Sequence, residues 1–172
     1  MIKFSSGLDM FLWNLLIVGI WHVCIFIACI KFPKSTFDPS REKFRPKAWE
    51  HGGKWYKEKL KIQTWKDKVP QFIGKDGFSK QHFTDVSIDY LDQFIFETCR
   101  GEWTHRKNCA SILITLLINP LIPGIFFSFL ILLGNVPFAL IQRYNRFRLQ
   151  TLRKKLLRGM GTANVNSNTV TA

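Results

Sequence analysis

The sequence predicts a mainly α-helical integral membrane protein, organised as a single membrane domain over residues 1–172, and three observations lead to this prediction. Hydrophobic residues make up 47% of the chain, while its formal net charge is +13. Charged and apolar residues are segregated, since residues 10–30 and 109–141 carry no charge. Apolar stretches of about 20 residues match the hydrocarbon thickness of a bilayer. This pattern excludes an ordinary soluble globule, a disordered chain and a disulfide-stabilised secreted domain.

The first apolar stretch, residues 8–30, is expected to form a transmembrane helix. The apolar region of a cleaved signal peptide is typically about 7–15 residues long and ends at a small-residue cleavage site. The stretch here is longer and contains Trp13, Trp21 and His22. We therefore expect a retained anchor rather than a cleaved signal.

Residues 31–108 are expected to form a cytoplasmic or interfacial segment. The charged residues from 31 to 107 comprise 17 bases and 11 acids, and Trp, Tyr and Lys are concentrated between residues 49 and 69. Aromatic rings with lysine head groups are typical of the boundary between lipid and water. A basic, aromatic segment would also suit single-stranded nucleic acid, but its position beside an apolar span favours lipid or an anionic cofactor. No nucleic-acid partner is expected. The apolar spacing over residues 87–105 predicts a helix.

The second apolar region, residues 109–141, is expected to form a membrane hairpin with its turn at residues 119–124. Asn-Pro and Pro-Gly pairs interrupt the region there, and proline cannot continue a helix interior without losing a hydrogen bond. The first arm is short, so either it is re-entrant or the preceding polar helix extends it. Pro137 is expected to kink the second arm.

Residues 142–160 are expected to form a basic juxtamembrane helix, and residues 161–172 a disordered tail. Seven bases and no acid follow Ile141, and leucines at 149, 152 and 156 share one side, which is typical of a helix lying on anionic lipid. Basic flanks stay cytoplasmic. We therefore expect three spans in the cell membrane, with the N-terminus outside and a cytoplasmic active face.

A polar group precedes the second apolar region and includes Glu97, Arg100, Glu102 and His105. On a helix, His105 lies about 60° from Glu102 and one turn along. A carboxylate at that position can orient an imidazole that acts as general base. Arg100 can pair with Glu97, which is expected to shape a substrate site. The competing interpretation is a polar helix whose charges are solvated or paired.

Neither metal binding nor cysteine chemistry is expected. A metal site at His105 would need a third ligand, for which His82 and His51 are the candidates, and their spacing does not require one. The four cysteines show no Cys-x-x-Cys spacing, so we interpret them as structural. His22 lies alone among apolar residues and is expected to be a hydrogen-bonded helix partner rather than a proton relay.

A second polar group surrounds the end of the hairpin. Its members are Asn135, Gln142, Arg143, Tyr144, Asn145 and Arg146. Basic residues that hold a helix end on the cytoplasmic side account for the arginines. They do not account for the amides, which need partners near a membrane boundary. A polar pocket between the hairpin's end and the cytoplasmic segment would supply such partners.

These residues resemble a known family. The pattern Asn135-Val136-Pro137 followed by the block from Gln142 to Arg146 is similar to the glycosyl-4,4'-diaponeurosporenoate acyltransferases. The likeness extends over residues 50–149. It also includes His82, Glu97, Thr98, Arg100, Glu102 and His105, and the positions of Glu50, Lys54, Trp65, Lys66 and Lys68.

The resemblance implies the final step of staphyloxanthin-type carotenoid synthesis, in which a fatty acyl group esterifies the primary hydroxyl of a glucose carried by a carotenoid acid. His105, oriented by Glu102, would be the base, with His82 as the rival. Arg100 or Arg143 would stabilise the oxyanion or hold donor phosphates.

The expected partners are the bilayer, a glycosylated carotenoid or glycolipid acceptor, and an acyl donor. No bound cofactor is expected, because acyl-CoA or a similar donor would be a co-substrate, with Lys54, Lys66 and Lys68 near its phosphates and Trp65 in the substrate site. Two alternatives stay open: acyl transfer to another glycolipid or phospholipid, and a non-catalytic basic membrane adaptor.

Overall fold

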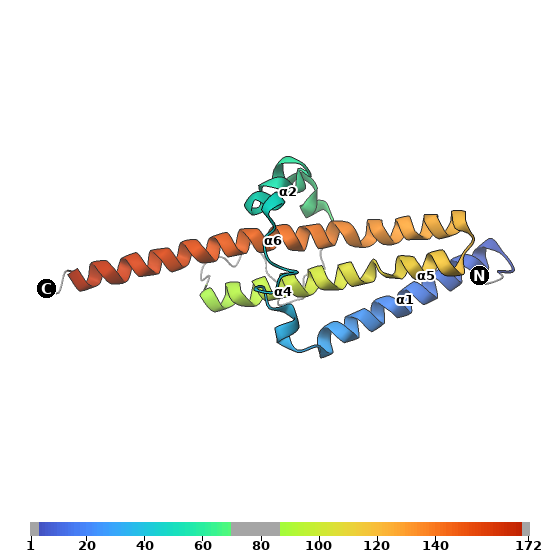
Figure 1. The fold of residues 1–172 in the computed structure, drawn as a ribbon, viewed down its shortest axis with the longest axis horizontal. Coiled ribbons are helices and arrows are strands. Elements are labelled where there is room, and N and C mark those ends of the chain that lie inside the picture. Colours follow the sequence, from blue (N-terminus) through green and yellow to red (C-terminus); the bar gives the residue numbers. More distant parts are fainter. Residues whose placement is uncertain (1–3, 70–86, 170–172) are drawn as a thin grey trace. The chain divides into compact units, whose positions relative to one another are not determined.

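The computed structural model describes residues 4–69 and 87–169, with side chains up to residue 160 (Figure 1). Within these ranges all regular structure is helical, which confirms the mainly α-helical class. The chain divides into two units. Unit 1 consists of Met1–Asp38 and Cys99–Gln142, and unit 2 of Pro39–Thr98 and Arg143–Ala172.

Helix α1 (Gly7–Lys31) corresponds closely to the first predicted span. The Ser6 hydroxyl accepts a hydrogen bond from the backbone N–H of Asp9 and so caps the helix. An acidic residue in the first turn and Lys31 in the last turn both interact favourably with the helix dipole. The helix ends at Phe32, whose extended backbone is the conformation favoured before Pro33.

The hairpin turn is shorter than the sequence predicted. Helix α5 (Ser111–Ile118) ends before Asn119 and Pro120, and helix α6 (Leu121–Thr169) begins immediately afterwards. Pro123 lies in the first turn of α6, where a backbone N–H has no intrahelical acceptor and proline is tolerated. The predicted turn at 119–124 was therefore too long. Pro137 lies inside α6, whose helical conformation continues across it.

Within residues 4–69 and 87–169, two helices, α1 and α6, are long and apolar enough to cross a membrane, whereas three spans were predicted. The 8-residue α5 is about 12 Å long at 1.5 Å per residue, which is too short to span by itself. Helix α4 (Ile88–Asn108) precedes it after a turn at residues 109–110, in which the Cys109 N–H bonds to the His105 carbonyl. The short arm α5 thus follows the polar helix α4 after a two-residue turn.

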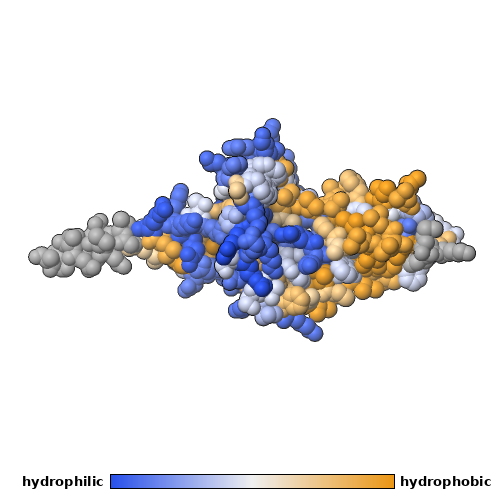
Figure 2. All heavy atoms as spheres, viewed as in Figure 1, coloured by the Kyte–Doolittle hydropathy of each residue, from blue (hydrophilic) through white to orange (hydrophobic). Residues whose placement is uncertain are grey.

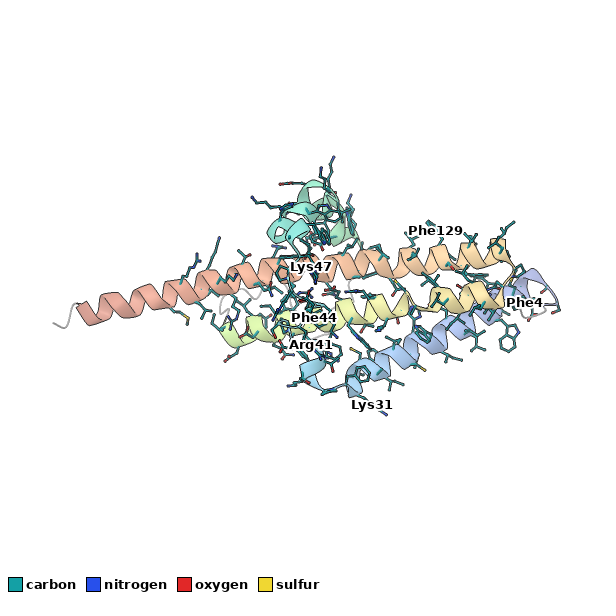
Figure 3. All side chains as sticks on the ribbon, in the orientation of Figure 1. Phe4, Lys31, Arg41, Phe44, Lys47 and Phe129 are labelled. Atoms are coloured by element: carbon teal, nitrogen blue, oxygen red, sulfur yellow. The ribbon has the colours of Figure 1, made fainter. Side chains whose placement is uncertain are left out.

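Unit 1 has apolar side chains on its surface and polar side chains between its helices. Leu117 and Ile122 are 75% and 80% exposed, and Phe129 projects outward from α6 (Figure 3). Figure 2 shows apolar side chains gathered over α1, α5 and the first part of α6. The buried polar side chains of this unit include Asn14, Asn108, Ser111, Thr115, Asn119, Ser128 and Asn135.

Two of the buried polar contacts join helices of unit 1 directly. The side-chain amides of Asn14 and Asn119 exchange two hydrogen bonds, at 2.8 and 2.7 Å, between α1 and the residue that follows α5. The hydroxyls of Thr115 and Ser128 lie 3.0 Å apart and connect α5 to α6. Figure 1 shows α1 lying beside α5 in this unit.

In unit 2, the predicted interfacial segment forms short helical pieces. These are η2 (Ala48–Gly53), α2 (Lys54–Glu58), α3 (Ile62–Trp65) and η3 (Lys66–Lys68). The 3-10 helix η1 (Lys34–Phe37) precedes them in unit 1.

The leucine face of the basic region was predicted to lie on lipid, and this was wrong. Leu149 packs with Leu91 and Ile95 of α4 in a buried cluster, joined by Leu152 and Leu156 of the same face. The sequence correctly predicted that these leucines share one face of a helix. That face packs against α4, so it is not available to lipid. The basic region also continues α6 without a break, and the helix extends to Thr169 through part of the predicted disordered tail.

Candidate active site

His105 lies on α4 in unit 1, where its ring is half-buried. Its Nδ1 lies 3.2 Å from the side-chain oxygen of Asn135 on α6. One face of the ring stacks on Phe138, with ring centroids 5.1 Å apart and planes inclined by 17°. An amide contact in the ring plane and an aromatic contact on its face together restrain the imidazole.

Asn135 connects His105 to α1. It is 5% exposed, and its amide nitrogen donates to the Ile131 carbonyl at 3.0 Å. The same nitrogen lies 3.4 Å from Nε2 of His22, whose Nδ1 lies 2.8 Å from the Val18 carbonyl oxygen. His22 is thus a hydrogen-bonded helix partner, as expected, and it also adjoins the candidate base through one amide.

The surroundings of His105 favour its neutral form. Burial lowers the pKa of the imidazole, because the charged form loses hydration. The hydrogen bond with Asn135 acts in the opposite direction, and the nearby His22 ring disfavours a charge on His105 further. The net effect is a pKa below the ordinary value of 6.5, so the ring is neutral at pH 7. A neutral imidazole is the form that can accept a proton.

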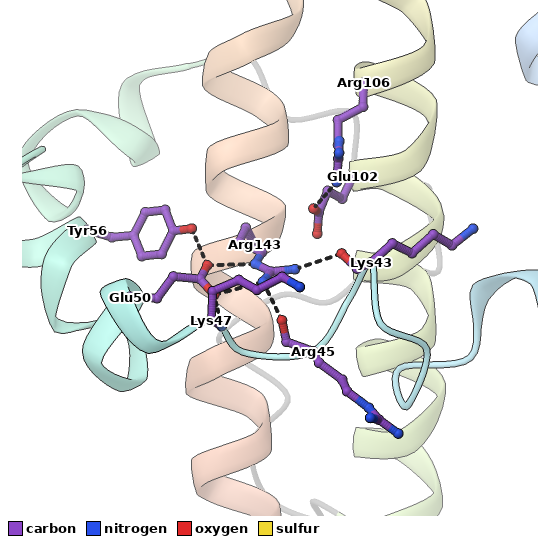
Figure 4. A network of polar contacts seen from close by, with 8 residues as sticks. All are labelled: Lys43, Arg45, Lys47, Glu50, Tyr56, Glu102, Arg106 and Arg143. Carbon is purple, nitrogen blue, oxygen red and sulfur yellow. Dashed lines mark hydrogen bonds and ion pairs between the residues drawn. The ribbon is translucent and has the colours of Figure 1, made fainter.

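Glu102 does not occupy the orienting position that the sequence assigned to it. Its carboxylate is buried and lies 3.4 Å from the Arg106 guanidinium one turn further along α4 (Figure 4). The neighbour of His105 Nδ1 is Asn135, from a different helix. Helical spacing alone shows which residues share a face, whereas the direction of each side chain depends on its tertiary neighbours.

Unit 2 contains a buried ion pair centred on Glu50, which is 0% exposed. Its carboxylate accepts hydrogen bonds from Arg143 at 2.7 Å on each oxygen (Figure 4). The Tyr56 hydroxyl also donates to it at 2.5 Å, and the Lys47 backbone N–H at 2.6 Å. Burial opposes ionisation, but these donors outweigh it and hold the pKa of Glu50 below its ordinary value. Burial and the adjacent carboxylate raise the pKa of Tyr56.

Arg143 also donates to the backbone carbonyls of Lys43 at 3.2 Å and Arg45 at 2.6 Å. These contacts fasten the segment from Lys43 to Tyr56 onto α6. The geometry therefore assigns Arg143 a positioning role and does not favour the predicted role at an oxyanion or phosphate. The sequence placed Tyr56 only among the aromatic residues expected at the lipid boundary, and only the family resemblance pointed to Glu50. No local pattern reveals that Arg143, 93 residues away, is the partner of Glu50.

The remaining candidates of unit 2 are largely engaged in packing. Tyr144 accepts a hydrogen bond from Gln63, and Arg146 is 2% exposed with its guanidinium over the Phe44 ring. Trp65 donates to the Leu60 carbonyl, and the buried Lys66 ammonium contacts Asp67. Asn145 is half-buried, and Glu97 accepts a hydrogen bond from Gln93. These contacts stabilise the unit.

In unit 1, Gln142 packs against Gly101, where an added Cβ would lie 2.9 Å from the amide carbon. Arg100 is half-buried on α4. His82 lies outside the described residues. Among the residues that the structure does describe, no three His, Cys, Asp or Glu side chains gather into a group able to hold a metal.

Over the part of the chain that the structure describes, fold and site define a mainly helical protein with two helices apolar enough to span a membrane. A half-buried histidine, whose pKa is lowered by burial, lies on an adjoining helix. Residues 40–155 match the family model of glycosyl-4,4'-diaponeurosporenoate acyltransferase, and the chain belongs to this family. The matched range contains His105, Asn135, Glu50 and Arg143.

Curated relatives carry the same name. The chain is 28% identical over 132 residues to the glycosyl-4,4'-diaponeurosporenoate acyltransferase of Staphylococcus aureus strain MRSA252, covering 74% of this chain and 78% of the relative. It is 27% identical, with the same coverage, to the protein of that name from the bovine strain RF122 / ET3-1. No solved structure matches this chain.

Proposed function

We propose that this protein transfers a fatty acyl group to the primary hydroxyl of the sugar on a glycosylated carotenoid acid, with His105 as general base. Membership of the acyltransferase family, matched over residues 40–155, is the observation that carries this proposal. The relatives' names supply the acceptor class and the acyl transfer. The neutral, restrained imidazole of His105 supplies a group suited to proton abstraction.

In the proposed step, Nε2 of His105 removes the proton of the sugar hydroxyl while the oxygen attacks the acyl carbonyl. A tetrahedral intermediate forms and then collapses, so that the new ester C–O bond replaces the bond to the leaving group. The imidazolium returns its proton to that leaving group. A positioned base of this kind contributes about 10²–10⁴-fold to the rate.

The proposed donor is an acyl thioester such as acyl-CoA, used as a co-substrate. Its phosphates would need cations accessible to solvent. Lys54 and Lys68 are exposed and suit that role, whereas Lys66 is buried against Asp67. With Arg143 held in the buried pair with Glu50, the half-buried Arg100 is the better candidate for stabilising the oxyanion.

The proposed location is the cell membrane, with the active face on the cytoplasmic side. Supporting this, unit 1 exposes large apolar side chains and buries amides and hydroxyls between helices, an arrangement that suits lipid better than water. The basic segments flank the apolar ones, as the positive-inside rule requires. Single cysteines introduced at exposed positions 57 and 155 should both react with a membrane-impermeant reagent only from the cytoplasmic side.

The deciding experiment measures acylated pigment by mass spectrometry in a host that supplies the glycosylated carotenoid. Wild type should add one fatty acyl ester to the sugar. His105→Ala should reduce the initial rate by about 10²-fold or more, in line with the loss of a general base. The exposed His51 provides the matched control, since His51→Gln should leave the rate unchanged.

Other outcomes identify the alternatives. An ester on another glycolipid, with none on the glycosylated carotenoid, would replace the proposed acceptor. Charge reversal of Arg153, Lys154 and Lys155 tests the adaptor alternative. If that change abolished function while His105→Ala did not, the protein would be a basic membrane adaptor and the enzymatic proposal would be wrong.

A further inference from the structure

We propose that Asn135 is the positioning residue of the general base: it holds His105 in the tautomer protonated at Nδ1, and His22 fixes which way the Asn135 amide faces. The inference deepens the proposed function and rests on it for its catalytic meaning. All residues involved belong to unit 1. Hydrogen bonds connect His22 to Asn135 and Asn135 to His105. The position of the proton in one contact determines which atom must donate and which must accept in the next.

The series begins at His22 on α1. Its Nδ1 lies 2.8 Å from the Val18 carbonyl oxygen, which can only accept a hydrogen bond. Nδ1 of His22 must therefore carry a proton. In the neutral ring this leaves Nε2 as an acceptor, and that nitrogen faces Asn135.

The orientation of the Asn135 amide follows from two acceptors on the same side. Its nitrogen lies 3.0 Å from the Ile131 carbonyl oxygen and 3.4 Å from Nε2 of His22. An amide nitrogen has two hydrogens, one for each acceptor, whereas the amide oxygen in that position would face two acceptors without a proton to share. The oxygen of Asn135 is thereby directed to His105.

The tautomer of His105 is then determined. Nδ1 lies 3.2 Å from the Asn135 oxygen, which can only accept, so Nδ1 carries the proton. In the neutral ring Nε2 is left with its lone pair. Stacking on Phe138 restrains the plane of the ring, so the lone pair also has a defined direction.

An amide suits this position better than a carboxylate. A carboxylate would select the same tautomer but would favour the imidazolium, which cannot accept a proton. The groups that face His105 are His22 from α1 and the uncharged Asn135 and Phe138 from α6. On α4 itself, Glu102 and Arg106 lie within a turn and contact each other. Asn135 raises the proton affinity of His105 less than a carboxylate would, so it can orient the base while burial still keeps the pKa of the ring below its ordinary value.

Nuclear magnetic resonance of the full-length protein, labelled with ¹⁵N at the histidine ring nitrogens and kept in detergent micelles, tests the inference directly. His105→Gln identifies the His105 signals. The wild-type ring should show a protonated Nδ1 and an unprotonated Nε2 at neutral pH. A His105 ring protonated at Nε2 would overturn the inference whatever the activity of the protein, so its failure is separable from that of the proposed function.

Two substitutions at Asn135 separate a positioning role from a structural one. Asn135→Leu should lower kcat by about 10- to 100-fold, the usual effect of losing a group that orients a reactive side chain, with a small change in KM. Asn135→Asp keeps an acceptor and should restore the Nδ1 proton, while moving the acidic limb of the rate–pH profile to higher pH. A folded Asn135→Leu protein with the wild-type tautomer and profile would contradict the proposal.

His22→Phe provides a graded control. It removes one acceptor for the Asn135 nitrogen and leaves the Ile131 carbonyl, so the amide keeps part of its orientation. The expected loss in kcat is smaller than that of Asn135→Leu, with a smaller change of the same kind in the His105 signals. A loss larger than that of Asn135→Leu, with the His105 signals unchanged, would assign His22 a separate role and overturn its place in the series.

Discussion

The carboxylate of Glu50 and the guanidinium of Arg143, 93 residues apart in the sequence, meet in a bidentate pair with both N–O distances at 2.7 Å. Glu50 is 0% exposed and Arg143 is 7% exposed. Each oxygen of Glu50 has a further donor, from Tyr56 or from the backbone of Lys47. The pair connects the short helices that follow Lys47 to the basic half of α6.

Breaking this pair from either side should destabilise the protein strongly. Glu50→Ala or Arg143→Ala leaves one buried charge without its partner, which costs about 3–5 kcal/mol in the free energy of unfolding. Thermal unfolding in detergent, followed by circular dichroism, measures the loss. The matched control is the exposed bidentate pair of Arg153 with Asp92, where Arg153→Ala should cost about 0–1 kcal/mol. Equal losses of unfolding free energy for the two pairs would contradict the conclusion that the Glu50–Arg143 pair is buried and structurally important.

The same pair predicts how stability depends on pH. The pKa of Glu50 in the folded state is lower than its ordinary value of 4.5. Its contribution to stability is therefore complete above pH 4.5 and is lost as the pH falls through the lower, folded-state value. Unfolding measured across pH 3–7 should show a decline on the acid side, and Glu50→Gln should flatten it. An unchanged acid dependence in that variant would show that other carboxylates cause the decline.

Alanine substitutions at two adjacent glycines distinguish the cost of backbone strain from the cost of steric overlap. Gly52 and Gly53 both have positive φ, at +65° and +94°, but only at Gly53 would an added Cβ lie 3.0 Å from Cβ of Phe147. Gly52→Ala should therefore cost about 1–2 kcal/mol of stability, the usual penalty for a left-handed alanine. Gly53→Ala should cost more, because Phe147 must also move. Unfolding temperatures that fall equally would contradict the close approach of η2 to α6.

Because the amides of Asn14 and Asn119 bond to each other, substitutions at the two positions should have strongly non-additive effects on stability. Both residues are at least 97% buried, and each single change to leucine leaves one amide without its partner. The expected cost is about 1–3 kcal/mol for each single variant. The double variant Asn14→Leu/Asn119→Leu removes both amides and should cost clearly less than the sum. Additive losses in unfolding by denaturing detergent would show that the two amides act independently.

The activity should depend on pH through His105. Since burial lowers its pKa below 6.5, the ring remains neutral at pH values where an exposed histidine is half protonated. Acyl transfer should therefore persist down to pH 6.5 and fall only below it, with the inflection at the folded-state pKa. Initial rates from pH 5 to 8 test this. An inflection above pH 6.5 would show that a different group limits the rate.

Local features of the sequence were sufficient to predict where helices α1 and α4 form. The uncharged run ending at Ile30 predicted α1, and the apolar spacing after residue 87 predicted α4, because helix formation depends on neighbours three and four residues apart. The same periodicity placed Leu149, Leu152 and Leu156 of the basic region on one helix face. It could not reveal that this face packs on Leu91 and Ile95 rather than on lipid, since a leucine stripe has the same spacing against either partner.

The sequence by itself determined the helical class and the apolar segments, and it offered His105 and His82 as candidate bases. Only the tertiary structure decided the partners: Asn135 rather than Glu102 beside His105, and Glu50 with Arg143. The physical reason is that a helix is selected by interactions within a few residues. A buried polar group, in contrast, is satisfied by whichever donor or acceptor the packing of distant segments brings within about 3 Å.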